Sequence, residues 1–167
     1  MTLNIHIKIL EEKDVTQNYV DWFKNKEIIE FSDNQYRKFT LNSQREYVRT
    51  MFLKSASDLY GIFDGDLHIG NIVLSNYENL HKRADITYVV GVREYWGKGV
   101  ATKAIALIIS KAREEYKLNK LTAGCAEKNE ASKKVLEKNG FKLEGKKEKH
   151  LFYNGSWMRQ FDYGLVL

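Results

Sequence analysis

The stretch of this 167-residue chain that says most about its fold reads Val89-Val90-Gly91-Val92-Arg93-Glu94-Tyr95-Trp96-Gly97-Lys98-Gly99-Val100-Ala101-Thr102. It begins at the end of a run of β-branched and aromatic residues typical of a strand, and Gly97 and Gly99 indicate a tight turn. From Val100 onward the apolar residues have helical spacing. Because the first turn of a helix has free N–H groups and a partial positive charge, this strand, turn and helix predict a cradle for a phosphate group.

Spacing tests two familiar phosphate-binding templates. A P-loop needs four residues between its first glycine and a Gly-Lys pair that is followed by Ser or Thr. Here Gly91 lies one residue too far from that pair, and Gly99 follows Lys98. A dinucleotide-binding turn needs Gly or Ala where Thr102 stands. Neither template fits, so a plain tight turn between a strand and a helix stays an open interpretation.

A second motif runs from Asn129 to Phe141, in the order Asn-Glu-Ala-Ser-Lys-Lys-Val-Leu-Glu-Lys-Asn-Gly-Phe. It follows a short apolar run and has helical spacing, with Asn129 and Ser132 three residues apart and therefore on one face. Gly140 is typical of the end of a helix. The simplest interpretation is that Asn129 caps this helix.

The rest of the chain supplies the elements of one mixed α/β or α+β domain spanning residues 1–167. Alternation over Leu3–Ile9 predicts a strand. We expect helices after Asp14 as a cap and after Ser43-Gln44-Arg45-Glu46 as a capping box. A hairpin is expected around Asp64-Gly65-Asp66. The other expected elements are a polar loop at Ser75–Arg83, strands at Ala84–Val92, Leu121–Ala126, Phe141–Glu148 and Trp157–Val166, and helices at Gly99–Tyr116 and Asn129–Asn139.

Composition narrows the class of protein. The chain has 27 Lys and Arg against 22 Asp and Glu, a formal net charge of +5, which favours an anionic partner: a nucleic acid, an acidic membrane surface or a phosphorylated small molecule. A single cysteine excludes an internal disulfide. The longest apolar run, around Ile105–Ile109, is far shorter than the roughly 20 residues that span a bilayer. With no signal-peptide pattern visible, we expect a cytoplasmic protein that does not associate with membranes.

Two motifs together resemble a known family. The segment from Trp96 to Ala101 is similar to the Q/R-x-x-G-x-G/A loop of the GNAT N-acetyltransferase superfamily, with Trp96 in place of Gln or Arg. The segment from Asn129 to Phe141 resembles the second motif of that superfamily. The sequences of Tyr95–Gly99 and Asn154-Gly155 are similar to those found in the RimJ/RimL-like branch of this superfamily. The resemblance covers essentially the whole chain.

The resemblance implies a fold and a cosubstrate. The fold is a central, mixed, mostly antiparallel sheet of about seven strands, flanked by about four helices and splayed between the fourth and fifth strands. The cosubstrate is acetyl-CoA, and no metal is needed. The residues that would bind acetyl-CoA are Val90, Val92, Trp96, Gly97, Lys98, Gly99, Val100, Ala101, Thr102, Asn129, Ser132 and Lys138.

The resemblance also implies catalytic roles. The Val90 N–H would polarise the thioester carbonyl, and Asp85, acting through water, would accept the proton of the amine. Alternatively, Asp85 has a structural role, in which it fixes the register of its strand or pairs with a nearby Arg. The other candidates for the base are Glu127 and His150. The tyrosine that often protonates the thiolate is absent, because that region reads Val135-Leu136. Its nearest replacement is Ser132, which could instead contact pantetheine or phosphate, or no acid is needed.

The acceptor pocket of this fold is shaped by the N-terminal helices, where the candidate substrate-binding residues are Trp22, Tyr36 and Arg37. The first-ranked acceptor is a nucleotide-linked amino sugar, whose diphosphate Arg37, Lys38 or Arg83 could meet. A protein N-terminus is the second candidate and a polyamine or aminoglycoside the third. Two hypotheses of another class are a nucleic-acid-binding module, which lacks any supporting motif, and a non-catalytic acyl-CoA sensor. A homodimer is left open, since many relatives form dimers.

Overall fold

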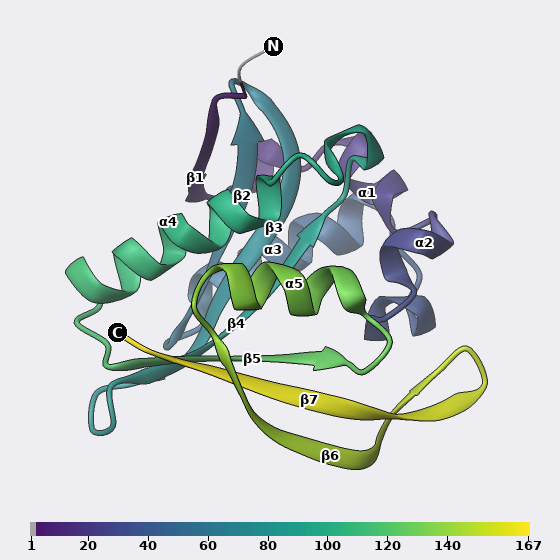
Figure 1. The fold of residues 1–167 in the computed structure, drawn as a ribbon. Helices are drawn as coiled ribbons and strands as arrows, with labels where there is room; N and C mark the ends of the chain where they lie inside the picture. The colour runs from purple at the N-terminus through teal and green to yellow at the C-terminus, as the bar shows by residue number, and fades with distance from the viewer. Residues whose placement is uncertain (1–2) are drawn as a thin grey trace.

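A computed structural model describes residues 3–167 and contains one seven-stranded sheet in the order β1-β2-β3-β4-β5-β7-β6 (Figure 1). All neighbouring strands are antiparallel except β4 and β5, which are parallel. The expected mixed, mostly antiparallel sheet is therefore confirmed. The strands are β1 (Ile5–Ile9), β2 (Ser57–Asp64), β3 (Leu67–Glu78), β4 (Arg83–Val90), β5 (Lys120–Ala126), β6 (Lys142–Tyr153) and β7 (Ser156–Val166).

Helices cover both faces of the sheet. α4 and α5 lie on one face, and α1 and α3 pack against β2 and β3 on the other (Figure 1). Residues 3–167 contain five α-helices where about four were expected, because the N-terminal segment contains a four-residue helix, α2. The helices are α1 (Gln17–Trp22), α2 (Lys26–Ile29), α3 (Leu41–Leu53), α4 (Val100–Glu114) and α5 (Glu130–Lys138), with 3-10 turns η1 (Glu12–Asp14), η2 (Asp33–Tyr36) and η3 (Arg93–Tyr95).

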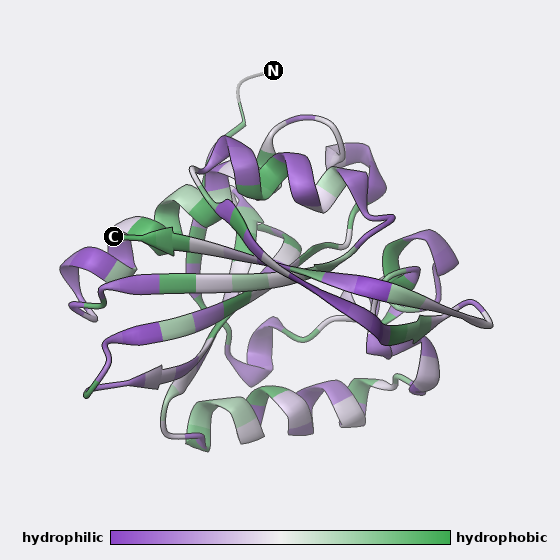
Figure 2. Cartoon of the chain, turned by 60° about the horizontal axis from the view of Figure 1, so that its bottom comes forward, coloured by the Kyte–Doolittle hydropathy of each residue, from purple (hydrophilic) through white to green (hydrophobic). Residues whose placement is uncertain are grey.

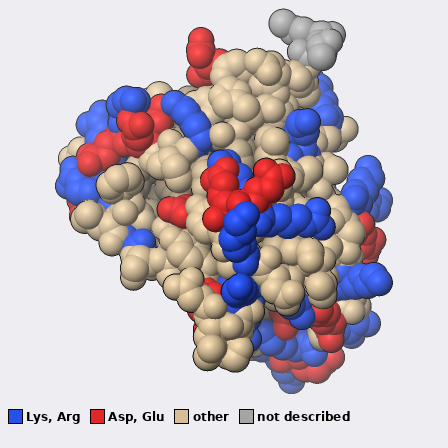
Figure 3. Space-filling model, turned by 90° about the vertical axis from the view of Figure 1, so that its left-hand side faces the viewer, with Lys and Arg blue, Asp and Glu red and all other residues tan. Residues whose placement is uncertain are grey.

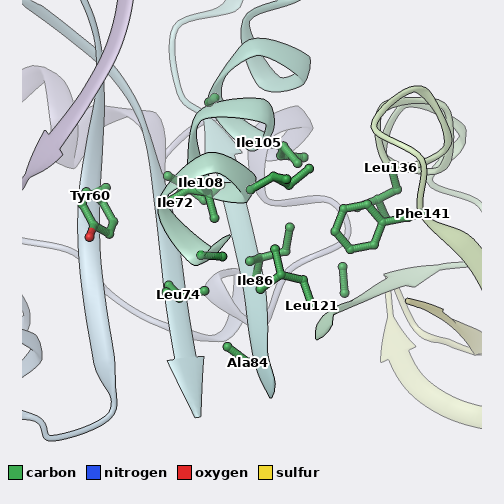
Figure 4. Close-up of a cluster of buried hydrophobic side chains, with 14 of the residues drawn as sticks. Tyr60, Ile72, Leu74, Ala84, Ile86, Ile105, Ile108, Leu121, Leu136 and Phe141 are labelled. Carbon is green, nitrogen blue, oxygen red and sulfur yellow. The ribbon is translucent and has the colours of Figure 1, made fainter. Parts of the chain in front are cut away.

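The main core lies between the sheet and the helices α4 and α5 (Figure 4). Ile105 and Ile108 of α4 are fully buried over Ile72 and Ile86 of the central strands. Leu136 extends this core to α5. Such burial is worth about 1.5–3 kcal/mol for each large aliphatic side chain, so it holds both helices on the sheet.

Two helix starts differ from the expected ones. Thr16, not Asp14, caps α1, since its side chain accepts from the Tyr19 N–H, and Asp14 instead closes η1. α3 begins earlier than expected, because the capping box pairs Thr40 with Ser43. Ser43 accepts the N–H of Thr40 as the third residue of the box and does not open the helix.

The strand β3 is longer than expected and includes the first four residues, 75–78, of the segment Ser75–Arg83 that was expected to be a polar loop. Ser75 pairs with Asp85 and Glu78 with Arg83, so polar residues continue the ladder along an exposed part of the sheet. A strand with a solvated face tolerates such residues, because only the alternate side chains need to be apolar.

The outer surface is polar and its charges are mixed. β6, one of the two edge strands of the described sheet, is hydrophilic along most of its length (Figure 2), which discourages pairing with other chains. On the face drawn in Figure 3, Lys and Arg side chains are interspersed with Asp and Glu and form no single-sign field. Within residues 3–167, no helix is long and apolar enough to cross a membrane.

Candidate active site

The site is built around a wedge between β4 and β5. The two strands pair only where Arg83–Asp85 faces Lys120–Thr122. β4 then continues to Val90 alongside β3, and β5 continues to Ala126 alongside β7. Beyond Asp85 the strands therefore separate, as Figure 1 shows, and the expected splay is confirmed.

The backbone of Val90 faces this wedge. The Gly91 N–H donates to the Ile69 carbonyl of β3 at 2.8 Å. Because hydrogen bonding alternates along an antiparallel pair, the polar backbone groups of Val90 point away from β3 and toward β5. The indole Nε1 of Trp96 donates to the Val90 carbonyl at 2.8 Å, which supports this orientation. The carbonyl is thus occupied, and the Val90 N–H points into the opening.

The turn that follows presents the amino end of α4. Gly97 and Gly99 have φ values of 71° and 78°, a region that glycine enters without steric cost. Gly99 is the N-cap of α4 and supplies no capping side chain, so the first N–H groups of the helix are left for another acceptor. A Cβ on either glycine would meet no atom of residues 3–167 within 4 Å, so the approach to this turn is open.

The side chains around this turn are divided between core and solvent. Val100 is buried in the main core, and Val92 packs against both large clusters. These two residues can reach a ligand only through their backbone. Lys98 lies 5.9 Å from the centroid of the Tyr95 ring at the exposed side.

The start of α5 closes the other side of the wedge. Asn129 Oδ1 accepts the Ser132 N–H at 3.1 Å, so Asn129 caps the helix. The Ser132 hydroxyl lies 2.7 Å from the hydroxyl of Tyr88, which comes from β4. Lys138 is the last residue of α5, about 13 Å along the helix axis from Asn129. The structure brings Asn129 and Ser132 together and places Lys138 apart from them.

The only cysteine of the sequence, Cys125, lies on β5, the strand that precedes α5. Cys125 is 7% exposed on β5, and burial raises the pKa of its thiol to about 11, which keeps it protonated. This agrees with its expected role as a small buried side chain.

Asp85 lies at the closed end of the wedge. Its carboxylate accepts from Asn76 Nδ2 at 2.8 Å and from the Thr122 hydroxyl. Asp85 is five residues before Val90, which corresponds to about 16 Å along the strand. The structure does not bring Asp85 and the Val90 N–H into direct reach. Of the ion pairs formed among residues 3–167, none includes Asp85, which argues against the expected alternative of an Arg partner.

Of the two alternative bases, Glu127 is already occupied. It accepts the backbone N–H of Arg159 at 2.9 Å and the Nε of Arg159 at 2.9 Å. These hydrogen bonds, the backbone one first, hold the pKa of Glu127 below its usual range. His150 lies instead on β6, where it lines a groove.

That groove lies between η2 and the β6–β7 hairpin. Its volume is about 510 Å³. The Tyr153 hydroxyl donates to Asp33 Oδ1 at 2.9 Å, and the Tyr36 hydroxyl donates to the Phe152 carbonyl, so the two segments are joined. The lining residues are Asp33, Tyr36, His150, Leu151, Phe152, Tyr153, Trp157 and Gln160.

The three residues expected to bind the acceptor are placed differently from one another. Tyr36 lines the groove and is 60% exposed. Arg37 follows it, at the exposed end of η2. Trp22 is 3% exposed and lies directly beneath Gly91, where a Cβ would come within 1.9 Å of its ring. Trp22 therefore supports the end of β4 from below and does not line the groove.

Sequence reasoning missed Tyr88 and most of the groove. Tyr88 and Ser132 are 44 residues apart and meet only through the packing of α5 on β4. Phe152 and Tyr153 lie outside the expected strand Phe141–Glu148, because β6 in fact continues to Tyr153, and Trp157 was expected only as the first residue of the last strand.

A wedge with an open N–H, followed by a helix start that can accept a phosphate group, is the arrangement that the resemblance to the GNAT superfamily implies for an acyltransferase. The model of the Acetyltransferase (GNAT) domain family matches residues 5–142. The chain belongs to this family and is an N-acetyltransferase of the GNAT type.

The names of two relatives agree with this assignment to the GNAT family. The chain is 32% identical over 161 residues to YdaF of Bacillus subtilis (strain 168), provisionally named a ribosomal N-acetyltransferase; the match covers 91% of this chain and 85% of YdaF. It is 31% identical over 88 residues to spermidine N(1)-acetyltransferase of Escherichia coli (strain K12), covering 53% of this chain and 47% of that enzyme. Both relatives are named as N-acetyltransferases.

Solved structures share the fold. RimL, a ribosomal L7/L12 alpha-N-protein acetyltransferase in complex with coenzyme A, superposes with a TM-score of 0.88 at 20% identity, covering 100% of this chain and 96% of RimL. The chain is thus similar in fold to a protein solved in complex with coenzyme A.

Proposed function

We propose that this enzyme transfers the acetyl group of acetyl-CoA to the α-amino group of a peptide or protein chain. The observation that carries the choice of acceptor is the groove between η2 and the β6–β7 hairpin. Its lining includes the carboxylate of Asp33, three aromatic rings besides Tyr36, and no Lys or Arg. A protonated amine is attracted by a carboxylate and by aromatic faces, whereas a diphosphate is not.

This proposal replaces the amino sugar as the first-ranked acceptor. A nucleotide-linked sugar needs a cation for its diphosphate, and the groove lining offers none. YdaF, one of the relatives that match along most of their length, is provisionally named for ribosomal acetylation, which supports a peptide acceptor. A polyamine is the second candidate, because Asp33 and the aromatic walls also suit an alkyl ammonium and a spermidine acetyltransferase is among the relatives.

The residues of the wedge fit acetyl-CoA. When bound, this cosubstrate supplies an activated acetyl group on sulfur. The Val90 N–H would donate to the carbonyl oxygen of that group, where negative charge grows during transfer. The backbone amides from Gly97 to Thr102 would hold the pyrophosphate at the start of α4. The Ser132 hydroxyl would meet the sulfur, and the amide nitrogen of Asn129 is left to bind the pantetheine arm.

The amine must lose a proton before it attacks. We retain Asp85 as the acceptor of this proton, reached through water because of the distance along β4. The carboxylate of Asp85 is exposed and is held by the neutral donors Asn76 and Thr122. His150 is the alternative, since it lies in the groove itself.

Paired variants separate these two bases. Asp85→Asn is expected to lower kcat at neutral pH by roughly tenfold or more and to leave acetyl-CoA binding unchanged. His150→Gln is expected to leave kcat within about twofold of the native enzyme. The reverse pattern in pH–rate profiles would assign the base to His150.

The acceptor is tested by measuring release of the CoA thiol with a panel of amines: short peptides with a free N-terminus, spermidine and a nucleotide-linked amino sugar. We expect the peptides to have the highest kcat/KM. Asp33→Asn is expected to raise the KM for the acceptor several-fold, while Glu46→Gln on α3, outside the groove, is the matched control. Preference for the amino sugar, or no effect of Asp33→Asn, would contradict the proposed acceptor.

A further inference from the structure

A hydrogen bond between two side chains crosses the wedge where the cosubstrate would lie. Tyr88 extends from the separated part of β4, and Ser132 from the first turn of α5. Their hydroxyl oxygens are 2.7 Å apart, and the Tyr88 hydroxyl also lies 3.4 Å from the Ser132 carbonyl. Because β4 and β5 no longer pair at this level, this contact is a direct link between the two walls.

The environment keeps the phenol of Tyr88 protonated, so either hydroxyl of the pair has a hydrogen to donate. Burial raises the pKa of Tyr88 to about 12, so the phenol is neutral and remains a donor at any physiological pH. The backbone N–H of Ser132 is already bonded to Asn129 Oδ1, which fixes the position of Cα. When Tyr88 donates to Ser132 Oγ, the hydrogen of Ser132 is left for a different acceptor.

We propose that Tyr88 is a positioning residue for the leaving thiol, holding Ser132 Oγ so that the serine hydrogen points to the sulfur as it departs. The proposal rests on the role proposed above for Ser132. Helix α5 has Val135-Leu136 where relatives often have the tyrosine that protonates the thiolate. In this proposal, the phenol of Tyr88 on β4 contributes to the site by holding the Ser132 hydroxyl in place.

The chemistry balances without a proton leaving either side chain. The amine nitrogen bonds to the acetyl carbon, the carbon–sulfur bond breaks, and its electron pair stays on sulfur. The proton of the amine passes to the base. Ser132 and Tyr88 keep their protons and contribute only hydrogen bonds, which strengthen as negative charge collects on the sulfur.

The test is a double-mutant cycle of Tyr88→Phe and Ser132→Ala, which remove one oxygen each. Turnover is measured twice, as acetyl transfer to an amine and as slow hydrolysis of acetyl-CoA by water. We expect Ser132→Ala to lower kcat about tenfold to a hundredfold, and Tyr88→Phe about fivefold with an unchanged KM for acetyl-CoA. The double variant should equal Ser132→Ala, because Tyr88 acts only through Ser132.

Two further variants make the outcome decisive. Tyr163→Phe is the matched control, since Tyr163 is buried and donates to Glu137 of the same helix at 3.1 Å, away from Ser132. Ser132→Thr keeps the hydroxyl and should retain most of the turnover lost in Ser132→Ala. Additive losses in the cycle, or a Tyr88→Phe enzyme as active as Tyr163→Phe, would overturn the proposal.

Hydrolysis separates this proposal from the choice of acceptor. Water replaces the amine in that assay, so the effects of Tyr88 and Ser132 should persist even if no peptide is acetylated. If peptides fail as acceptors while the cycle behaves as expected, only the acceptor is wrong. If hydrolysis is insensitive to both substitutions, the positioning role of Tyr88 is refuted whatever the acceptor.

Discussion

The contact between Gly91 and Trp22 supports a prediction that tests the geometry of the wedge. In Gly91→Ala the new methyl group would lie 1.9 Å from Cδ2 and 2.3 Å from Cε3 of the Trp22 ring. Ordinary carbon contacts begin near 3.4 Å, so the ring or the strand must move by about 1.5 Å. Gly91 does not have a positive φ, so an alanine causes no backbone strain there. The destabilisation would come only from the clash with Trp22.

Neither partner moves easily. Trp22 is 3% exposed and packs against the rings of Tyr19 and His68 at centroid distances of 4.9 and 4.8 Å. The Gly91 N–H is bonded to the Ile69 carbonyl. Overpacking of this kind costs about 1–3 kcal/mol, which lowers the Tm of a domain of this size by roughly 2–12 °C. The same shift displaces the neighbouring Val90 N–H, and a displacement near 1 Å lowers kcat by up to about 100-fold.

Thermal unfolding and steady-state kinetics measure both effects. Gly145→Ala is the matched control, because its methyl group would come no closer than 4.0 Å to Asp162 and should change neither Tm nor kcat. A Gly91→Ala enzyme with native Tm and native kcat would refute the argument that Trp22 fixes the end of β4. A lower Tm with native kcat would support the steric clash with Trp22. It would contradict the argument that the clash displaces the Val90 N–H.

Three further predictions address the cradle, the core and an acidic group. Gly99→Ala places a side chain at a φ of 78°, where it costs about 1–2 kcal/mol, and should raise the KM for acetyl-CoA several-fold; an unchanged KM would exclude this turn as the phosphate site. Leu136→Ala, at a fully buried position, should lower stability by about 2–5 kcal/mol in urea unfolding, and a loss below about 1 kcal/mol would show that α5 is not held by this contact. The hydrogen bonds from Arg159 keep the pKa of Glu127 below its unfolded value, so the stabilisation is present above that value and is lost as pH falls through the lower, folded pKa. Glu127→Gln should therefore flatten the acid side of the stability profile, measured as urea midpoints against pH, and an unaltered slope would contradict this.

Local sequence predicted those parts of the site that depend on neighbours in the chain. Gly97 and Gly99 form the expected turn, and Asn129 and Gly140 begin and end α5, because φ preferences and side-chain caps act over a few residues. Where two residues could each cap the same helix, the sequence pattern indicated the wrong one. Ser43 follows a capping-box pattern with Glu46, yet Thr40 is the true cap.

What the sequence determined by itself was the order of elements, the two motifs and, through them, the family. These are short-range properties, read from spacing along one chain. The tertiary structure decided which side chains meet around the wedge: Trp22 lies under Gly91, Tyr88 meets Ser132, and Asp85 meets Thr122 at the closed end. These contacts arise from sheet pairing and helix packing between residues far apart in the chain, and no local pattern records them.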